Sequence, residues 1–241
     1  MDLKPIRTDG QPYDGQPPGG YQDVAVSSEQ SRKVLRNTYL MLALTMVPTA
    51  IGAAVGIQFA PVMMASPIIT VVLMLASLIG LQFAIVRFRD SAVGIGLLLL
   101  MTFLMGVFLG PLLNVALSMR NGAQLVGYAA LGTGAIFLAM GTLAQTIKRD
   151  LAFMGKFLFV GMIALLIAML ANMFLQIPAL ALTISTLVIV VYSLFLVYDL
   201  QRIVRGGETN YVLATTGVYI SLLNIFSSLL HLLMAFTGER D

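Results

Sequence analysis

Seven long apolar runs constrain this chain more than any other feature of its sequence. Each has roughly 19 to 26 residues, enough to cross a hydrocarbon core of about 30 Å at 1.5 Å per helical residue. A transmembrane β-strand would need only about 10 residues, with apolar and polar side chains alternating. The predicted spans cover about residues 37–57, 68–86, 92–117, 123–147, 153–175, 179–204 and 211–236. The sequence therefore predicts an all-α integral membrane protein with seven transmembrane helices.

The composition requires that lipid cover much of the chain. Of the 241 residues, 59% are hydrophobic and 10% are charged, whereas a soluble domain has about a quarter of its residues charged. The chain has no cysteine, which excludes disulfides and thiolate metal ligands. A single histidine without nearby carboxylates is a poor transition-metal site. We therefore expect no cofactor and no bound metal.

The polar segments predict how the chain is oriented. Residues 1–30 are rich in Gly, Pro, Gln and Asp and show no periodic apolar face, so we expect a disordered tail before a seven-helix domain at 31–241. Of the 14 Lys and Arg residues, all but Arg120 and Arg240 fall on the side of the N-terminus. That side has Lys4, Arg7, Arg32, Lys33, Arg36, Arg87, Arg89, Lys148, Arg149, Lys156, Arg202 and Arg205. The positive-inside rule then predicts a cytoplasmic N-terminus and an outer C-terminus.

Small residues recur at helical spacing in three spans and predict helix packing. In lipid, helices associate where small side chains let their backbones approach each other. The expected packing faces carry Gly52 and Gly56 in the first span, Thr102, Gly106 and Gly110 in the third, and Ala123, Gly127, Ala130, Gly134 and Gly141 in the fourth. Because most joints are short, we also expect consecutive helices to be antiparallel neighbours.

The seventh span carries small and polar side chains along one face. Its members recur at steps of three and four residues, so they share one side of a helix. They are Gly217, Ser221, Asn224, Ser228, His231 and Ala235. Because polar groups are costly against lipid, this face should look into protein or into a wet cavity. Interhelical hydrogen bonding and a lined pathway both explain it, and either places the seventh helix at the centre of the bundle.

Asp199 is the only carboxylate inside a predicted span, about five residues from the end of the sixth. A lone intramembrane carboxylate is a functional candidate by default. Arg87, Arg202 and Arg205 are expected at the same membrane level and are its candidate partners. A structural ion pair and a gating role both remain open.

Other polar residues mark the ends of the spans. The glycines at 206–207 should end the sixth helix in a left-handed conformation, and a residue at 209–210 should cap the seventh. On the opposite side, Asn114 follows a Gly-Pro pair that we expect to interrupt the third span. Together with Asn172 and Gln176, it is a candidate for the outer mouth of a cavity. Alternatively, these three side chains satisfy frayed helix ends.

Four segments together resemble one protein family. They are KVLRNTYLMLALT at 33–45, FLGPLLN at 108–114, LANMFLQIPAL at 170–180 and GGETNYVLATTGVYISLLNIF at 206–226. They are similar to the Bax-inhibitor family, the transmembrane BAX inhibitor motif proteins, from about residue 31 to the C-terminus. The resemblance implies seven transmembrane helices with the last surrounded by the other six. It points most to bacterial inner-membrane members that modulate the membrane protease FtsH.

The resemblance also bears on Asp199. Family members with a described mechanism are pH-sensitive calcium leaks, in which one aspartate on span six and another on span seven share a proton. The first matches Asp199 in VYDLQ, whereas the second falls on Ser221 in the frame VYISLLNIF. A serine cannot share that proton, so the resemblance implies that the coupled titration of two acids is absent here.

Three kinds of function are therefore weighed. The first is an interaction protein that binds FtsH or its membrane-bound partners and restrains proteolysis, with residues 1–30 as a handle. The alternative is a pH-sensitive leak for calcium or protons, gated around Asp199 and the polar face of the seventh span. We expect no enzyme, because an aspartyl protease needs two carboxylates. A Ser–His pair of Ser221 or Ser228 with His231 has no recognisable oxyanion site beside it.

Overall fold

Seven α-helices build the fold in a computed structural model, which describes residues 20–147, 151 and 153–238. The helices are α1 (Gly20–Ala65), α2 (Pro67–Phe88), α3 (Ala92–Ser118), α4 (Gly122–Thr146), α5 (Met154–Leu175), α6 (Pro178–Val204) and α7 (Tyr211–Gly238). All seven are long and apolar enough to cross a membrane, and no strand occurs in the described ranges. The predicted all-α, seven-helix membrane architecture is therefore confirmed.

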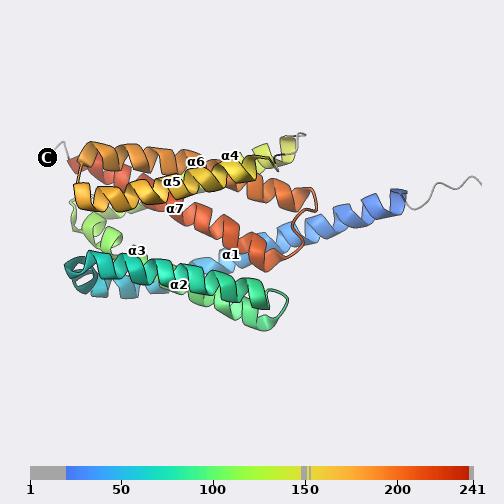
Figure 1. The fold of residues 1–241 in the computed structure, drawn as a ribbon, viewed down its shortest axis with the longest axis horizontal. Coiled ribbons are helices and arrows are strands. Elements are labelled where there is room, and N and C mark those ends of the chain that lie inside the picture. Colours follow the sequence, from blue (N-terminus) through green and yellow to red (C-terminus); the bar gives the residue numbers. More distant parts are fainter. Residues whose placement is uncertain (1–19, 148–150, 152, 239–241) are drawn as a thin grey trace, which may run out of the picture.

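The first helix is longer than predicted at both ends. α1 has 46 residues and remains helical through both of its prolines. Residues 58–65, which lie beyond the predicted end of the first span, are also helical. At the other end it begins at Gly20, inside the predicted tail, and projects beyond the bundle (Figure 1). Residues 1–19 lie outside the described residues, so disorder there stays a prediction. α3 also continues through its Gly-Pro pair, so the interruption expected in the third span does not occur.

The helices form two groups with α7 between them. In Figure 1, α2 and α3 lie on one side of α7, and α5 and α6 lie on the other. α7 packs against α1, α2, α3, α4 and α6, but no Cα atom of α5 comes within 8 Å of it among the described residues. The expectation that all six other helices surround α7 therefore stays unconfirmed.

The closest helix pair is α1 and α3, where glycines let the two backbones touch. A Cβ atom on Gly52 would overlap the carbonyl group of Phe103, and one on Gly110 would overlap the backbone of Gly56. Gly106 lies equally close to the backbone of α1. This confirms the packing face predicted for the first and third spans.

The glycines of α4 behave differently. A Cβ atom on Gly127 or Gly134 would meet no other atom within 4 Å. At Gly141 it would find only ordinary contacts, at 3.8 Å from Leu200 and 3.9 Å from the hydroxyl of Tyr39. The prediction of a tight packing face on the fourth span is therefore wrong at Gly127 and Gly134. Gly134 instead borders an open groove.

Consecutive helices are not always neighbours. Among the described residues, no Cα atoms of α4 and α5 come within 8 Å of each other, and each helix packs on α6 instead. The hydroxyl of Tyr198 on α6 would lie 2.7 Å from a Cβ atom on Gly155 of α5. The prediction that short joints make consecutive helices pack together is wrong for this pair, because α6 offers both of them a better surface.

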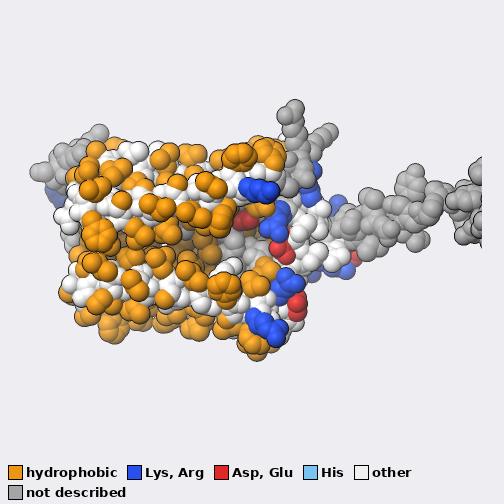
Figure 2. Space-filling model, in the orientation of Figure 1, with side chains coloured by type: hydrophobic (Ala, Val, Ile, Leu, Met, Phe, Trp, Pro, Cys, Tyr) orange, Lys and Arg blue, Asp and Glu red, His pale blue; other side chains and the backbone are white. Residues whose placement is uncertain are grey.

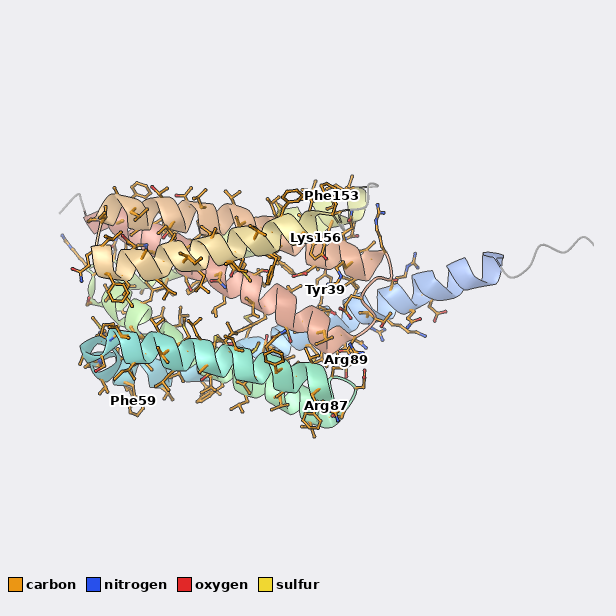
Figure 3. All side chains as sticks on the ribbon, viewed as in Figure 1. Tyr39, Phe59, Arg87, Arg89, Phe153 and Lys156 are labelled. Atoms are coloured by element: carbon orange, nitrogen blue, oxygen red, sulfur yellow. The ribbon has the colours of Figure 1, made fainter. Side chains whose placement is uncertain are left out.

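Charged side chains gather at one end of the bundle. Figure 2 shows apolar side chains along its length and most of the Lys and Arg side chains at the end from which α1 projects. Figure 3 places Arg87, Arg89 and Lys156 at this basic end and Phe59 at the opposite one. The residues Lys4, Arg7, Lys148, Arg149 and Arg240 lie outside the described residues. The charge asymmetry supports the predicted topology, although the side that faces the cytoplasm stays a prediction.

Candidate functional site

The turn between α6 and α7 fixes the start of the candidate site. Gly206 adopts the predicted left-handed conformation with φ of 74°, and the N–H of Gly207 donates to the carbonyl oxygen of Arg202 at 2.8 Å. The Oδ1 atom of Asn210 then accepts the N–H groups of Val212 at 3.0 Å and Leu213 at 3.1 Å. These bonds satisfy helix ends that would otherwise be unpaired, so both predicted caps are confirmed.

Asn210 also ties this turn to the joint between α2 and α3. Its Nδ2 atom donates to Oδ1 of Asp90 at 2.8 Å and to the carbonyl oxygen of Arg89 at 3.1 Å. One side chain therefore joins two loops at the basic end and sets where α7 enters the bundle.

Asp199 lies directly against the backbone of α7. A Cβ atom on Gly217 would be only 2.9 Å from Oδ2 of Asp199 and 3.3 Å from its Cγ. The carboxylate therefore occupies the space that the missing side chain of Gly217 leaves. This contact, which the sequence did not predict, connects the sixth-span aspartate with the first member of the polar face on α7.

Two of the three candidate arginines have partners other than Asp199. Arg202 approaches Glu208 at 3.4 Å, with its guanidinium 5.6 Å from the ring centre of Tyr198. Arg205 donates to the carbonyl oxygen of Ile147 at 3.3 Å. Within residues 20–147, 151 and 153–238, none of the three arginines forms an ion pair with Asp199. The ion pair, one of the two alternatives left open by the sequence, is therefore not formed in the described part of the chain.

The rest of the polar face extends along α7 towards the opposite end. Ser221 is 2% exposed and Ser228 is 6% exposed, so both are buried within protein. Asn224 donates to the carbonyl oxygen of Ile220 of its own helix at 2.8 Å. The prediction that this face points into protein is therefore confirmed for the two serines, whereas Gly217, Asn224, His231 and Ala235 are half-buried. The bond of Asn224 fits the structural explanation for its side chain.

His231 bonds to α6 rather than to a serine of its own helix. Its Nδ1 atom lies 2.9 Å from Oγ of Ser185, and Ser185 also donates to the carbonyl oxygen of Ala181 at 2.9 Å. No hydrogen bond between Ser228 and His231 occurs among the described residues. The Ser–His pair considered from the sequence is therefore replaced by an interhelical pair that joins α6 and α7.

The proposed outer mouth is not assembled. Asn114 is on α3, which has no Cα atom within 8 Å of α5 in the described part of the chain. On α5, the Oδ1 atom of Asn172 accepts the N–H of Ile177 at 3.1 Å, and Gln176 ends the helix with φ of 52°. These two residues cap a helix end, so the structural alternative given by the sequence analysis applies to them.

Two connections were missed from the sequence. The hydroxyl of Tyr219 on α7 lies 2.9 Å from Oγ1 of Thr49 on α1 and donates to the carbonyl oxygen of Thr102 on α3 at 3.2 Å. Gln201 on α6 accepts the N–H of Leu151 at 3.0 Å and donates to Ile147 at 3.2 Å. The available signal was a tyrosine in the middle of an apolar span and a glutamine two residues after Asp199.

The site offers one carboxylate and several neutral hydrogen-bonding groups. In the described ranges, no three His, Asp or Glu side chains gather into a group that would hold a metal ion. The arrangement between α6 and α7 is therefore a buried polar contact of the Asp199 carboxylate with the backbone at Gly217.

The comparisons with known proteins agree on one family. The family model described as "Inhibitor of apoptosis-promoting Bax1" matches residues 31–238. The Escherichia coli modulator of FtsH protease YccA is 38% identical over 218 residues, which cover 88% of this chain and 97% of that protein. A Vibrio cholerae membrane protein is 39% identical over 85% of this chain and 90% of its own length.

A Neisseria meningitidis protein shares 39% identity over 90% of this chain and 97% of its own length. These alignments extend over the whole seven-helix region rather than over one motif. The fold, the polar face of α7 and the matches along the chain support the same conclusion. This chain belongs to the Bax-inhibitor family of multi-pass membrane proteins.

Proposed function

We propose that this protein modulates FtsH-dependent proteolysis of membrane proteins through protein contacts at the bacterial inner membrane. The observation that carries the proposal is the similarity to YccA, named a modulator of FtsH protease, along 97% of that protein's length. The same relative in another Escherichia coli strain is named an inner membrane protein. The proposed orientation puts the basic end and the N-terminus in the cytoplasm.

The outer surface of the bundle is suited to helix contacts within the bilayer. α5 packs only on α6 among the described residues, and its side chains Phe157, Phe159 and Val160 are exposed. Association inside lipid depends on packing and a few hydrogen bonds rather than on the hydrophobic effect. A partner helix that docks on such a face would restrain a membrane substrate without any catalysis by this chain.

The N-terminal segment provides the second proposed contact. An ATP-driven cytoplasmic protease needs an unfolded end to grip, and residues 1–30 contain the segment that precedes the membrane-spanning part of α1. Two truncations distinguish the parts of this segment. One removes residues 1–19, which precede the described helix, and the other removes residues 1–30, which include the first turns of α1. A shuffled sequence of the same 19 residues is the matched control for charge and length.

The experiment measures FtsH association by affinity capture and the half-life of a membrane substrate of FtsH. Deleting the whole protein should shorten the substrate's half-life, and restoring the full chain should lengthen it. Unchanged association and turnover in all strains would refute the function. A full effect with the truncated chain would refute only the role of the N-terminal segment.

A cation leak is the second candidate, favoured by the position of Asp199. Its carboxylate lies inside a membrane-spanning helix against Gly217 and has no ion pair among the described residues. Calcium flux should be measured in liposomes at acidic and neutral pH, with Asp199→Asn as the variant. Absence of flux, or flux that the variant leaves unchanged, would remove Asp199 as a gate.

A further inference from the structure

A long groove separates α1 from α4. No Cα atoms of these helices come within 8 Å of each other among the described residues. Two cavities of about 470 Å³ each lie between them and share the side chains of Met46, Phe137 and Leu222. The two cavities adjoin at these three side chains, and together, with α7 as their floor, we call them the α1–α4 groove.

The interior of the groove is apolar. Most of its hydroxyl groups already have partners within the protein, since Tyr219 bonds to Thr49 at 2.9 Å and Thr133 donates to its own helix at 2.7 Å. The hydroxyl of Tyr39 lines the groove near its basic end. Methyl groups and bare backbone at Ala130 and Gly134 line the wall formed by α4. An occupant of this space therefore needs no polar groups along its length, and hydrocarbon is the chemistry that fits.

The volume of the groove is too small for a whole transmembrane helix. A helix about 10 Å across occupies about 120 Å³ per residue, so the two cavities of about 470 Å³ each would together hold only about eight of its roughly 20 residues. An unbranched alkyl chain has no such requirement and can follow a narrow groove along its length. The dimensions therefore favour a lipid acyl chain over a partner helix or a second copy of this chain.

The groove continues into a basic surface at one end. On α1, the groove-lining residues Tyr39, Ala43 and Met46 follow steps of four and three residues, and the same steps lead back to Arg36 and Arg32. Both arginines are exposed, and neither forms an ion pair among the described residues. The apolar groove therefore leads towards two unpaired positive charges.

These arginines lie near the level of the α6–α7 turn, where we expect the membrane surface. Ser31, next to Arg32, is 3.4 Å from a Cβ atom built on Gly206, so this part of α1 is level with the α6–α7 turn. Figure 3 places Tyr39 at the basic end with Arg87 and Arg89. Tyrosine, with an apolar ring and a polar tip, is enriched at this level of a membrane. A phosphate group would thus meet arginine where lipid headgroups are.

We propose that the α1–α4 groove binds one acyl chain of an anionic phospholipid, with its phosphate beside Arg32 and Arg36. Basic surfaces between membrane helices bind anionic headgroups, each arginine contributing about a fivefold increase in affinity. The acyl chain fills a space that would otherwise be a void between α1 and α4. The lipid thereby completes the packing of two helices that do not touch through their backbones.

The test uses the full chain in nanodiscs of phosphatidylglycerol and phosphatidylcholine. A trace of phosphatidylglycerol with a photoreactive acyl chain is activated by light, and labelled peptides are identified by mass spectrometry. Labels should concentrate on the groove-lining segments of α1, α4 and α7 rather than on the exposed face of α5. Gly134→Phe should remove the groove labels by filling the space.

Gly80→Phe is the matched control, because a Cβ atom on Gly80 also meets nothing within 4 Å but α2 lies outside the groove. It should leave the groove labels unchanged. Ala50→Phe, from the opposite wall, should reproduce the loss seen with Gly134→Phe. Exchanging Arg32 and Arg36 together for glutamine should weaken labelling by phosphatidylglycerol about 25-fold, from about fivefold per arginine. Labelling by a phosphatidylcholine probe with the same chain should not change.

Several outcomes would overturn the proposal. Labels spread evenly over α5 and the groove of the unsubstituted protein would show that no lipid is held in the groove. This result does not depend on whether the substituted proteins fold. Equal labelling by both headgroups would remove the role of the arginines. A crosslink between two copies, or a copurified protein helix seated in the groove, would identify a different occupant.

Discussion

The α1–α3 contact and the α1–α4 groove present the same sequence signal with opposite outcomes. The first pair has glycines at steps of four residues, and α4 has glycine and alanine at steps of three, four and seven. At the α1–α3 contact, Gly110 lies on the backbone of Gly56, so there is no room even for a methyl group. In the groove, Gly134 has no neighbour within 4 Å of an added Cβ atom.

The difference lies in what faces each glycine. Gly56 and Gly110 face each other, so both backbones lose their side-chain bulk at the same level. Across from α4, the ring of Tyr39 meets Phe137 in an edge-on contact with ring centres 5.8 Å apart. This ring contact bridges α1 and α4, whose backbones lie farther apart than those of α1 and α3. Small residues thus permit close approach, but they produce it only when the opposing residues are also small.

The largest expected effect comes from adding a methyl group at the α1–α3 contact. Gly110→Ala should lower the free energy of unfolding by about 1–3 kcal/mol or more, because backbone atoms cannot rotate away as a side chain can. Thermal or denaturant unfolding in detergent would measure it. Gly96→Ala, on the same helix with no neighbour within 4 Å, is the control and should not lose stability. Equal behaviour of the two variants would contradict the tight contact.

A smaller effect is expected from the hydroxyl of Tyr219, which joins α7 to α1 and α3. Tyr219→Phe keeps the ring but removes the bonds to Thr49 and Thr102, and we expect a loss of about 0.6–1.7 kcal/mol. Tyr128→Phe is the matched control, since Tyr128 is 59% exposed on α4. A double-mutant cycle with Thr49→Val isolates the interhelical bond. Additive effects in that cycle would show that the bond does not stabilise the contact.

The sequence was most informative where a pattern is local. The lengths of the apolar runs predicted all seven helices, and the glycines and Asn210 between α6 and α7 predicted the caps, because spanning and capping depend on residues within one segment. The contact of Asp199 with Gly217 and the hydrogen bond between His231 and Ser185 could not be predicted. Both depend on which helices are adjacent in the fold. Helices α4 and α5 are consecutive but do not pack on each other, so a short joint does not determine which helices are adjacent.

The smallest expected effect has the opposite sign and tests the groove itself. In α4, Gly134→Ala should raise the free energy of unfolding by about 0.5–1 kcal/mol. Alanine lowers the conformational entropy of the unfolded chain, and its methyl group meets no other atom in the folded protein. Gly127→Ala should behave alike, since its site is equally open. The measurement is unfolding in detergent, beside Gly110→Ala. If α1 and α4 instead close on each other in the membrane protein, Gly134→Ala would lose stability as Gly110→Ala does. The contrast between the two helix pairs would then disappear, because both sets of glycines would serve close backbone packing.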